Sequence, residues 1–168
     1  SDVYKRQALR IVGKYPDTLK GRKVAVLVAD GSDGTVVDAV RAAVEGDEGS
    51  IFIVAPKIGG AKLKDGSTLA ADGQLAGSPS VLFDAVAVVL SDDGCATLMK
   101  EGAAVDFVKD AFGHLKAIGH TPEAQPLLDK AGVEPDAGVI DLAKDADGFL
   151  APARTRQWDR EPKVRMLA

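Results

Sequence analysis

The feature that most constrains the fold is the apolar run VAVLVA at residues 24–29, which stops at Asp30 and Gly31. Six consecutive apolar residues rich in valine leave no polar side for solvent, so the run predicts a strand buried on both faces. Strands of this kind belong to parallel sheets that are covered by helices on both sides. The rest of the chain therefore has to supply further buried strands and the helices between them.

Alternating strand and helix patterns follow this run. Val36, Val37, Val40 and Val44 recur at helical spacing, so residues 33–45 predict an amphipathic helix. Apolar runs predict strands at residues 51–55, 83–90, 115–118 and 139–142, and periodic segments predict helices at residues 92–99, 103–115, 122–131 and 143–153. The alternation predicts an α/β domain: a doubly wound, mostly parallel sheet with helices on both faces.

Two segments fall outside this alternation. Residues 57–80 carry glycines every few positions and Asp-Gly turns, which predict a small excursion of one or two hairpins over the end of the sheet. Residues 154–168 predict an irregular C-terminal tail. Its charges alternate in sign, as in a solvated or interfacial segment, and Trp158 is expected to anchor it. The expected organisation is a linker or artificial remnant at 1–19, one domain at 20–153 and the tail at 154–168.

Composition excludes several classes of protein. A chain of 168 residues with 46% hydrophobic content fits one domain with a core. The net charge of −4, without a basic cluster, argues against nucleic acid as a partner. The apolar runs are too short to span a membrane, and no secretory leader is recognised. The single cysteine, Cys95, excludes an internal disulfide, so a reducing cytoplasmic location is expected.

Ligands of doubly wound sheets bind beyond the carboxyl ends of the strands. Two loops at those ends are therefore candidate ligand sites. The loop at residues 30–34 (DGSDG) could hold an anion at a helix N-terminus. It lacks the Gly-Lys-Ser/Thr ending of a phosphate loop, and its two aspartates repel phosphate, so we favour a structural turn. For Cys95, beside Asp92 and Asp93, we favour a packing role over a reactive thiol.

The second loop is GHT, residues 119–121, at the end of the segment KAIGHT. His120 stands at the end of a predicted strand, where it could serve as a base for a nucleophile. Its neighbours Gly119 and Thr121 provide no such group, and Thr121 is expected to cap the helix that begins at Pro122. We therefore favour a histidine satisfied by hydrogen bonds.

Several segments, in their order and spacing, resemble the C-terminal domain of large-subunit haem catalases. The resemblance runs from about residue 20 to the end and rests on GRKVAVLVADGSDG, IVAPKIGG, DFVKDAFGHLKAIGHT, LLDKAGV and WDREPKV. It implies a flavodoxin-like fold of the ThiJ/PfpI branch of class I glutamine amidotransferase-like domains. It also implies that residues 8–19 are the end of a linker from a haem-binding body.

The resemblance also implies a degenerate site. The ThiJ/PfpI branch carries Ala-Ile-Cys-His-Gly with cysteine as the nucleophile, whereas residues 117–121 read Ala-Ile-Gly-His-Thr. Gly119 thus replaces the cysteine, His120 keeps the histidine, and Asp33 stands near the place of the family's glutamate. Glycine tolerates the strained backbone of a nucleophile elbow, so we expect the bend to persist without the chemistry.

The expected function is a non-catalytic accessory domain of a catalase that decomposes hydrogen peroxide. Haem would belong to the parent protein, and this chain would bind neither cofactor nor metal. Its partners would be the haem-binding body and neighbouring subunits of a homotetramer. The alternative is a stand-alone ThiJ/PfpI-like stress protein, with chaperone-like activity or a degenerate hydrolase or glyoxalase site. A small-ligand pocket in the crevice is a third possibility.

Overall fold

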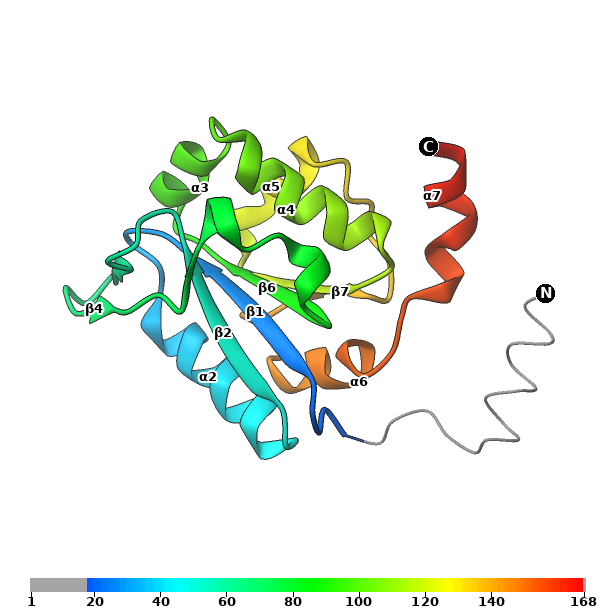
Figure 1. Ribbon diagram of the computed structural model, residues 1–168, viewed down its shortest axis with the longest axis horizontal. Helices are drawn as coiled ribbons and strands as arrows, with labels where there is room; N and C mark the ends of the chain where they lie inside the picture. Colours follow the sequence, from blue (N-terminus) through cyan, green and yellow to red (C-terminus); the bar gives the residue numbers. More distant parts are fainter. Residues whose placement is uncertain (1–17, 168) are drawn as a thin grey trace.

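A parallel six-stranded sheet organises the computed structural model, which describes residues 18–167 (Figure 1). The strand order is β5-β2-β1-β6-β7-β8, and every pairing within the sheet is parallel. The strands are β1 (Lys23–Val28), β2 (Ser50–Ala55), β5 (Gly73–Gln74), β6 (Ala85–Val89), β7 (Ala117–His120) and β8 (Val139–Asp141). The strand order reverses between β1 and β6, as expected for a doubly wound, flavodoxin-like sheet.

Helices cover both faces of this sheet, as predicted. The helix α2 (Gly34–Gly46) and the short α6 (Leu150–Ala153) lie on one face (Figure 1). The other face carries α3 (Asp92–Leu98), α4 (Gly102–Gly113) and α5 (Gln125–Lys130). Successive residues of β1 alternate between the two cores: Ala25 and Leu27 pack on one side, and Val24 and Val26 on the other. This alternation explains why the run carries no polar residue.

The glycine-rich excursion contains one hairpin, formed by β3 (Ala61–Lys62) and β4 (Thr68–Leu69). The second hairpin that we considered is absent, because β5 joins the main sheet parallel to β2. Asp72 brings it there: its main-chain N–H donates to the Ile53 carbonyl, and its carboxylate accepts from the Ile53 N–H at 2.8 Å.

Three predicted boundaries were wrong for local reasons. The strand expected at 115–118 begins two residues later, because Leu115 takes a left-handed φ of 63° after α4. The helix expected at 143–153 shrinks to the 3₁₀ turn η4 (Asp147–Phe149) and α6, because aspartate side chains bond nearby main-chain N–H groups instead. The tail is not irregular: it forms the 3₁₀ turn η5 (Trp158–Arg160) and α7 (Glu161–Leu167). The predicted linker lies outside the described residues, apart from Thr18 and Leu19.

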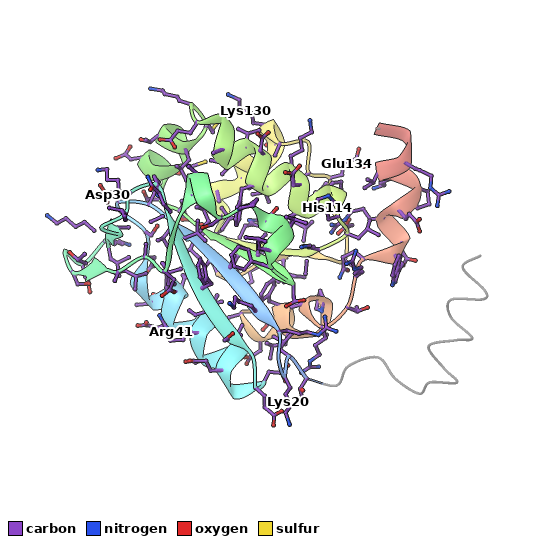
Figure 2. All side chains as sticks on the ribbon, viewed as in Figure 1. Lys20, Asp30, Arg41, His114, Lys130 and Glu134 are labelled. Atoms are coloured by element: carbon purple, nitrogen blue, oxygen red, sulfur yellow. The ribbon has the colours of Figure 1, made fainter. Side chains whose placement is uncertain are left out.

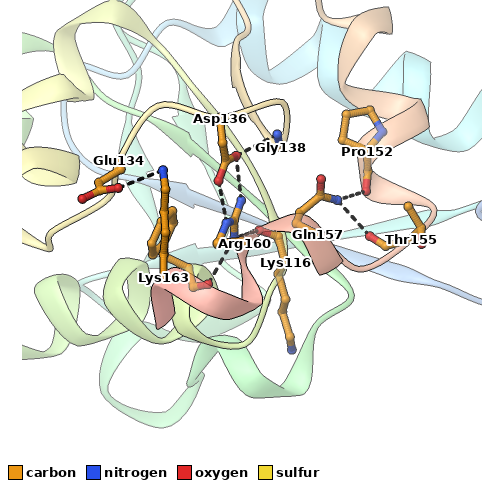
Figure 3. A network of polar contacts seen from close by, with 10 residues as sticks. Lys116, Glu134, Asp136, Gly138, Pro152, Thr155, Gln157, Arg160 and Lys163 are labelled. Atoms are coloured by element: carbon orange, nitrogen blue, oxygen red, sulfur yellow. Dashed lines mark hydrogen bonds and ion pairs between the residues drawn. The ribbon is translucent and has the colours of Figure 1, made fainter. Parts of the chain in front are cut away.

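A buried arginine holds this tail on the domain (Figure 3). Arg160 is 2% exposed and donates to both carboxylate oxygens of Asp136, at 2.8 and 3.1 Å. It also donates to the carbonyls of Phe112 and Lys116, and its guanidinium carbon lies 4.2 Å from the Phe112 ring centroid. Of the two alternatives expected for the charges of the tail, solvated or interfacial, the solvated one is wrong for Arg160, whose planar fork suits a buried pair.

A second ion pair joins the two ends of the domain. The Asp47 carboxylate receives the Arg154 guanidinium in bidentate fashion, at 2.6 and 2.9 Å. The same carboxylate accepts from the main-chain N–H of Leu19 at 3.0 Å, and the Leu19 side chain is fully buried. The start of the domain and the start of the tail thus share one aspartate. Among residues 18–167, no helix has the length and apolarity to cross a membrane.

Candidate functional site

Gly119 lies within β7, between β6 and β8, rather than at a bend. It pairs with Ala87 on one side and Ile140 on the other. Its φ does not fall in the left-handed region, and the strand continues through His120. The expected strained elbow at Gly119 was therefore wrong. What requires glycine here is space: a Cβ would lie 2.8 Å from Leu142 Cδ2 and 3.0 Å from Leu142 Cγ.

A cysteine at this position is expected to be costly. The Gly119→Cys variant should lose about 1–3 kcal/mol of unfolding free energy, because the buried Leu142 must move to admit the side chain. Urea denaturation would measure the loss. The control is Gly119→Cys in a Leu142→Ala background, where the added cost should shrink because the clashing atoms are gone. An equal cost in both backgrounds would contradict this account.

His120 is buried and hydrogen-bonded, as we favoured. It is 8% exposed, and its Nδ1 lies 2.9 Å from the Thr121 carbonyl oxygen, which can only accept, so Nδ1 carries the proton. Thr121 occupies the N-cap position of the 3₁₀ turn η3 (Pro122–Ala124), as predicted, but its side chain makes no capping hydrogen bond. Its hydroxyl accepts from the Leu90 N–H at 3.0 Å and donates to the Leu90 carbonyl at 2.9 Å. This hydroxyl joins the carboxyl ends of β6 and β7.

The structure does not bring Asp33 together with Gly119 and His120. Asp33 caps α2, and its Oδ1 accepts from the N–H and the hydroxyl of Thr35 at 2.9 and 2.7 Å. These bonds lower the pKa of the Asp33 carboxyl. Strand β6 separates β1 from β7, which corresponds to about 10 Å between those two strands. No hydrogen bond between Asp33 and His120 occurs within the described residues.

The loop at residues 30–34 is a structural turn, as interpreted from the sequence. The buried Ser32 hydroxyl accepts from the Ala29 N–H at 3.0 Å and donates to the Val89 carbonyl, so it is already used inside the fold. Gly31 has a φ of 92°, and a Cβ there would lie 2.7 Å from the Ser91 hydroxyl. These contacts close β1 against the end of β6.

A small pocket of about 210 Å³ lies beside this turn, at the carboxyl ends of β1 and β2. Its polar lining includes Asp30, Lys57, Asp93, Thr97 and Glu101. None of the three residues of the expected site, Gly119, His120 and Asp33, lines this pocket. The expected site and the pocket are therefore separate features. Within the described part of the chain, no three histidine, cysteine, aspartate or glutamate side chains are grouped to hold a metal.

Cys95 does not replace the missing nucleophile. Its side chain is 1% exposed in α3, and burial raises the pKa of the thiol. A thiol with a raised pKa carries little thiolate at neutral pH, and thiolate is the reactive form. The packing role favoured from the sequence is confirmed by this burial.

Sequence reasoning missed Lys116. Although it is a lysine, it is 6% exposed, and its ammonium donates to the carbonyls of Ser80 and Val81, at 3.0 and 2.9 Å, and to that of Phe83. Burial lowers the pKa of this ammonium, and the nearby charge of Arg156 adds to the effect. The only available signal was that Lys116 falls inside the segment predicted as a buried strand at residues 115–118.

Comparison with known proteins identifies the family. Residues 20–156 match the family model described as the C-terminal domain found in long catalases. The chain belongs to this family. It is 41% identical over 170 residues to Catalase C of Rhizobium meliloti (strain 1021), covering 98% of this chain and 24% of that protein. It is 33% identical to Catalase-1 of Neurospora crassa, covering 86% of this chain and 24% of that protein.

The chain thus spans about a quarter of the length of these catalases. Among solved structures, a mutant DJ-1 superfamily protein from Salmonella typhimurium superposes with a TM-score of 0.65 at 20% identity, covering 88% of this chain and 96% of that one. At this identity the likeness concerns the fold alone. It agrees with the ThiJ/PfpI-type, flavodoxin-like fold that the resemblance implied.

Proposed function

We propose that this chain is a non-catalytic accessory domain of a haem catalase that decomposes hydrogen peroxide. The observation that carries the proposal is the packing at Gly119. The position that the resemblance assigns to a nucleophile is closed by Leu142, and the only cysteine of the chain is buried elsewhere. Membership of the catalase C-terminal domain family supports the identity of the parent protein.

In this proposal the haem and the peroxide chemistry belong to the rest of the catalase polypeptide. The domain contributes to the stability of that body, to assembly of a cytoplasmic homotetramer, or to control of access to the haem. Such roles need a stable fold and an outer surface but no reactive side chain. The two buried cores and the hydrogen-bonded pair of Arg160 and Asp136 provide the stable fold.

The proposal predicts two results. Titration of the 168-residue chain with haem should produce neither stoichiometric binding nor peroxide turnover, with the full-length catalase as positive control.

Removal of this domain from the full-length catalase should shorten the half-life of thermal inactivation or shift the oligomeric state in ultracentrifugation. Stoichiometric haem binding with turnover by the chain alone would overturn the proposal, as would a deletion that changes neither of these two properties nor the access of peroxide to the haem.

A chaperone-like, stand-alone role is the second candidate. It is favoured by three large apolar side chains that face solvent: Ile58, Val81 and Leu82 are 84%, 56% and 63% exposed. Suppression of the aggregation of a heat-denatured client by the isolated chain, absent from an α/β protein of equal size, would support this role. The hydrolase or glyoxalase alternative loses support, because neither Gly119 nor Cys95 can supply a thiolate to the crevice.

A further inference from the structure

Two neighbouring apolar side chains are displayed on the 3₁₀ turn η2 (Ser80–Leu82). Val81 and Leu82 are 56% and 63% exposed, whereas Ser80 and Phe83 on either side are buried. The turn is thus fixed at both ends while its middle faces water. Large apolar neighbours that remain exposed in a folded domain are typical of a contact surface.

The side chain of Lys116 holds this turn in place through hydrogen bonds. Its ammonium donates to the carbonyls of Ser80, Val81 and Phe83. Three acceptors match the three N–H groups of a charged ammonium, whereas a neutral amine has only two. Burying an ammonium is unfavourable, and among residues 18–167 no carboxylate forms an ion pair with it. The buried ammonium thus ties η2 and the following Phe83 to the residue before β7.

The displayed pair lies beside the point where the chain enters the domain. Asp84, two residues after Leu82, accepts from the Lys23 N–H at 2.8 Å and donates its own N–H to the Lys23 carbonyl at 2.9 Å. Its carboxylate also lies 3.7 Å from the Arg22 guanidinium. Lys23 begins β1, so η2 lies at the amino ends of the parallel strands. We call this end of the sheet its amino edge. Figure 2 shows that Lys20 and Asp30, just before and after β1, lie at opposite ends of the sheet.

We propose that the amino edge of the sheet, centred on Val81 and Leu82 and bordered by Arg22 and Asp84, is the surface that docks on the haem-binding part of the same catalase polypeptide. This inference rests on the proposed function. The occupant follows from chain length and position: this chain corresponds to only 24% of its relatives, and the family match begins at residue 20. A tether that enters beside η2 keeps the rest of the polypeptide at high effective concentration near this edge. The matching surface should be apolar at its centre, with charged groups facing Arg22 and Asp84.

A photo-crosslinking experiment on the full-length catalase tests the assignment. A photoreactive phenylalanine analogue is placed at position 82 in one variant and at position 58 in the other. Ile58 is the matched control, because it is 84% exposed but follows the carboxyl end of β2. After irradiation, mass spectrometry should find crosslinks from position 82 to the haem-binding part, and none from position 58.

Each other outcome overturns the assignment. Crosslinks from position 82 to the same domain of another subunit would mean that the occupant is a second copy. Crosslinks to the haem-binding part from position 58 alone would place docking at the opposite edge and leave the proposed function intact. No crosslink from either position would exclude this surface. The haem titration and the domain deletion described above test the proposed function itself.

Substitutions provide a second readout. Val81→Asp combined with Leu82→Asp should shorten the thermal half-life of the full-length catalase at least fivefold. Ile58→Asp should leave it within twofold. The isolated 168-residue chain should keep its Tm in both variants, because all three side chains are exposed. Equal half-lives for the two full-length variants would contradict the docking assignment.

Discussion

Replacing Asp136 by asparagine is expected to lower the free energy of unfolding by about 3–5 kcal/mol, because it leaves the buried Arg160 guanidinium without its counter-charge. Asparagine keeps the shape of the side chain and one oxygen for the Gly138 N–H, which Asp136 Oδ1 now accepts at 2.8 Å. The loss should therefore report the charge rather than a cavity. Urea denaturation at neutral pH would measure it.

The matched control lies on the same side of the domain. The pair formed by Glu134 and Lys163 is as short, at 2.9 Å, but both side chains are about half exposed. Glu134→Gln should cost less than about 1 kcal/mol, because solvent screens exposed pairs. Equal losses in the two variants would show that Arg160 is solvated in solution, contrary to its burial in the structure.

The pair formed by Asp136 and Arg160 also predicts that the stability of the domain depends on pH. Burial alone would raise the pKa of the Asp136 carboxyl, but hydrogen bonds and charge from Arg160 hold it below its ordinary value of 3.8. A carboxyl with a lowered folded pKa contributes stability above its unfolded pKa and loses it as the pH falls through the folded value. The stability advantage of the unmodified chain over Asp136→Asn should thus be constant near neutrality and decline below about pH 4.

Replacing Lys116 by methionine is expected to cost about 3 kcal/mol, since buried carbonyls would lose their donor. Methionine retains most of the apolar stem, so lost packing contributes little. The effect should be local as well as global. Hydrogen exchange of the main-chain amides at residues 80–84 should accelerate more than that of β1, because the turn is no longer held.

Lys130→Met is the control for this variant. Lys130 also donates to a main-chain carbonyl, that of Met99 at 2.7 Å, but it lies on the surface. Its replacement should cost less than about 1 kcal/mol, because water can satisfy the freed carbonyl. A loss for Lys116→Met no greater than this would contradict the role of Lys116 as the anchor of η2.

The sequence predicted those parts of the fold that depend on local pattern. The alternation of apolar runs such as that of β1 with helical spacings such as that of α2 predicted a doubly wound sheet, because each pattern is satisfied within one element. Charged residues that become buried were not predicted. Lys116 and Arg160 are of types that ordinarily face water, and their acceptors come from segments at least 24 residues away in the sequence.

The candidate site was predicted in the same partial way. The resemblance placed Gly119, His120 and Asp33 together, and the structure leaves Asp33 bonded to its own helix. The expectation of a bend at Gly119 failed because the contact that requires glycine comes from Leu142, in the segment after the next strand. Such a contact depends on how β7 and β8 pair and cannot be read from the segment KAIGHT itself.

The aspartate shared by Leu19 and Arg154 has a mechanical consequence. Tension on the polypeptide ahead of Leu19 acts on Asp47 as well as on the chain that leads into β1, because the Leu19 N–H is bonded to the carboxylate and the main-chain carbonyl of Asp47. The same carboxylate grips Arg154, where the C-terminal tail begins. Part of a pull at one end of the domain is therefore passed to the other end through the Asp47 side chain, in parallel with the covalent path into the sheet.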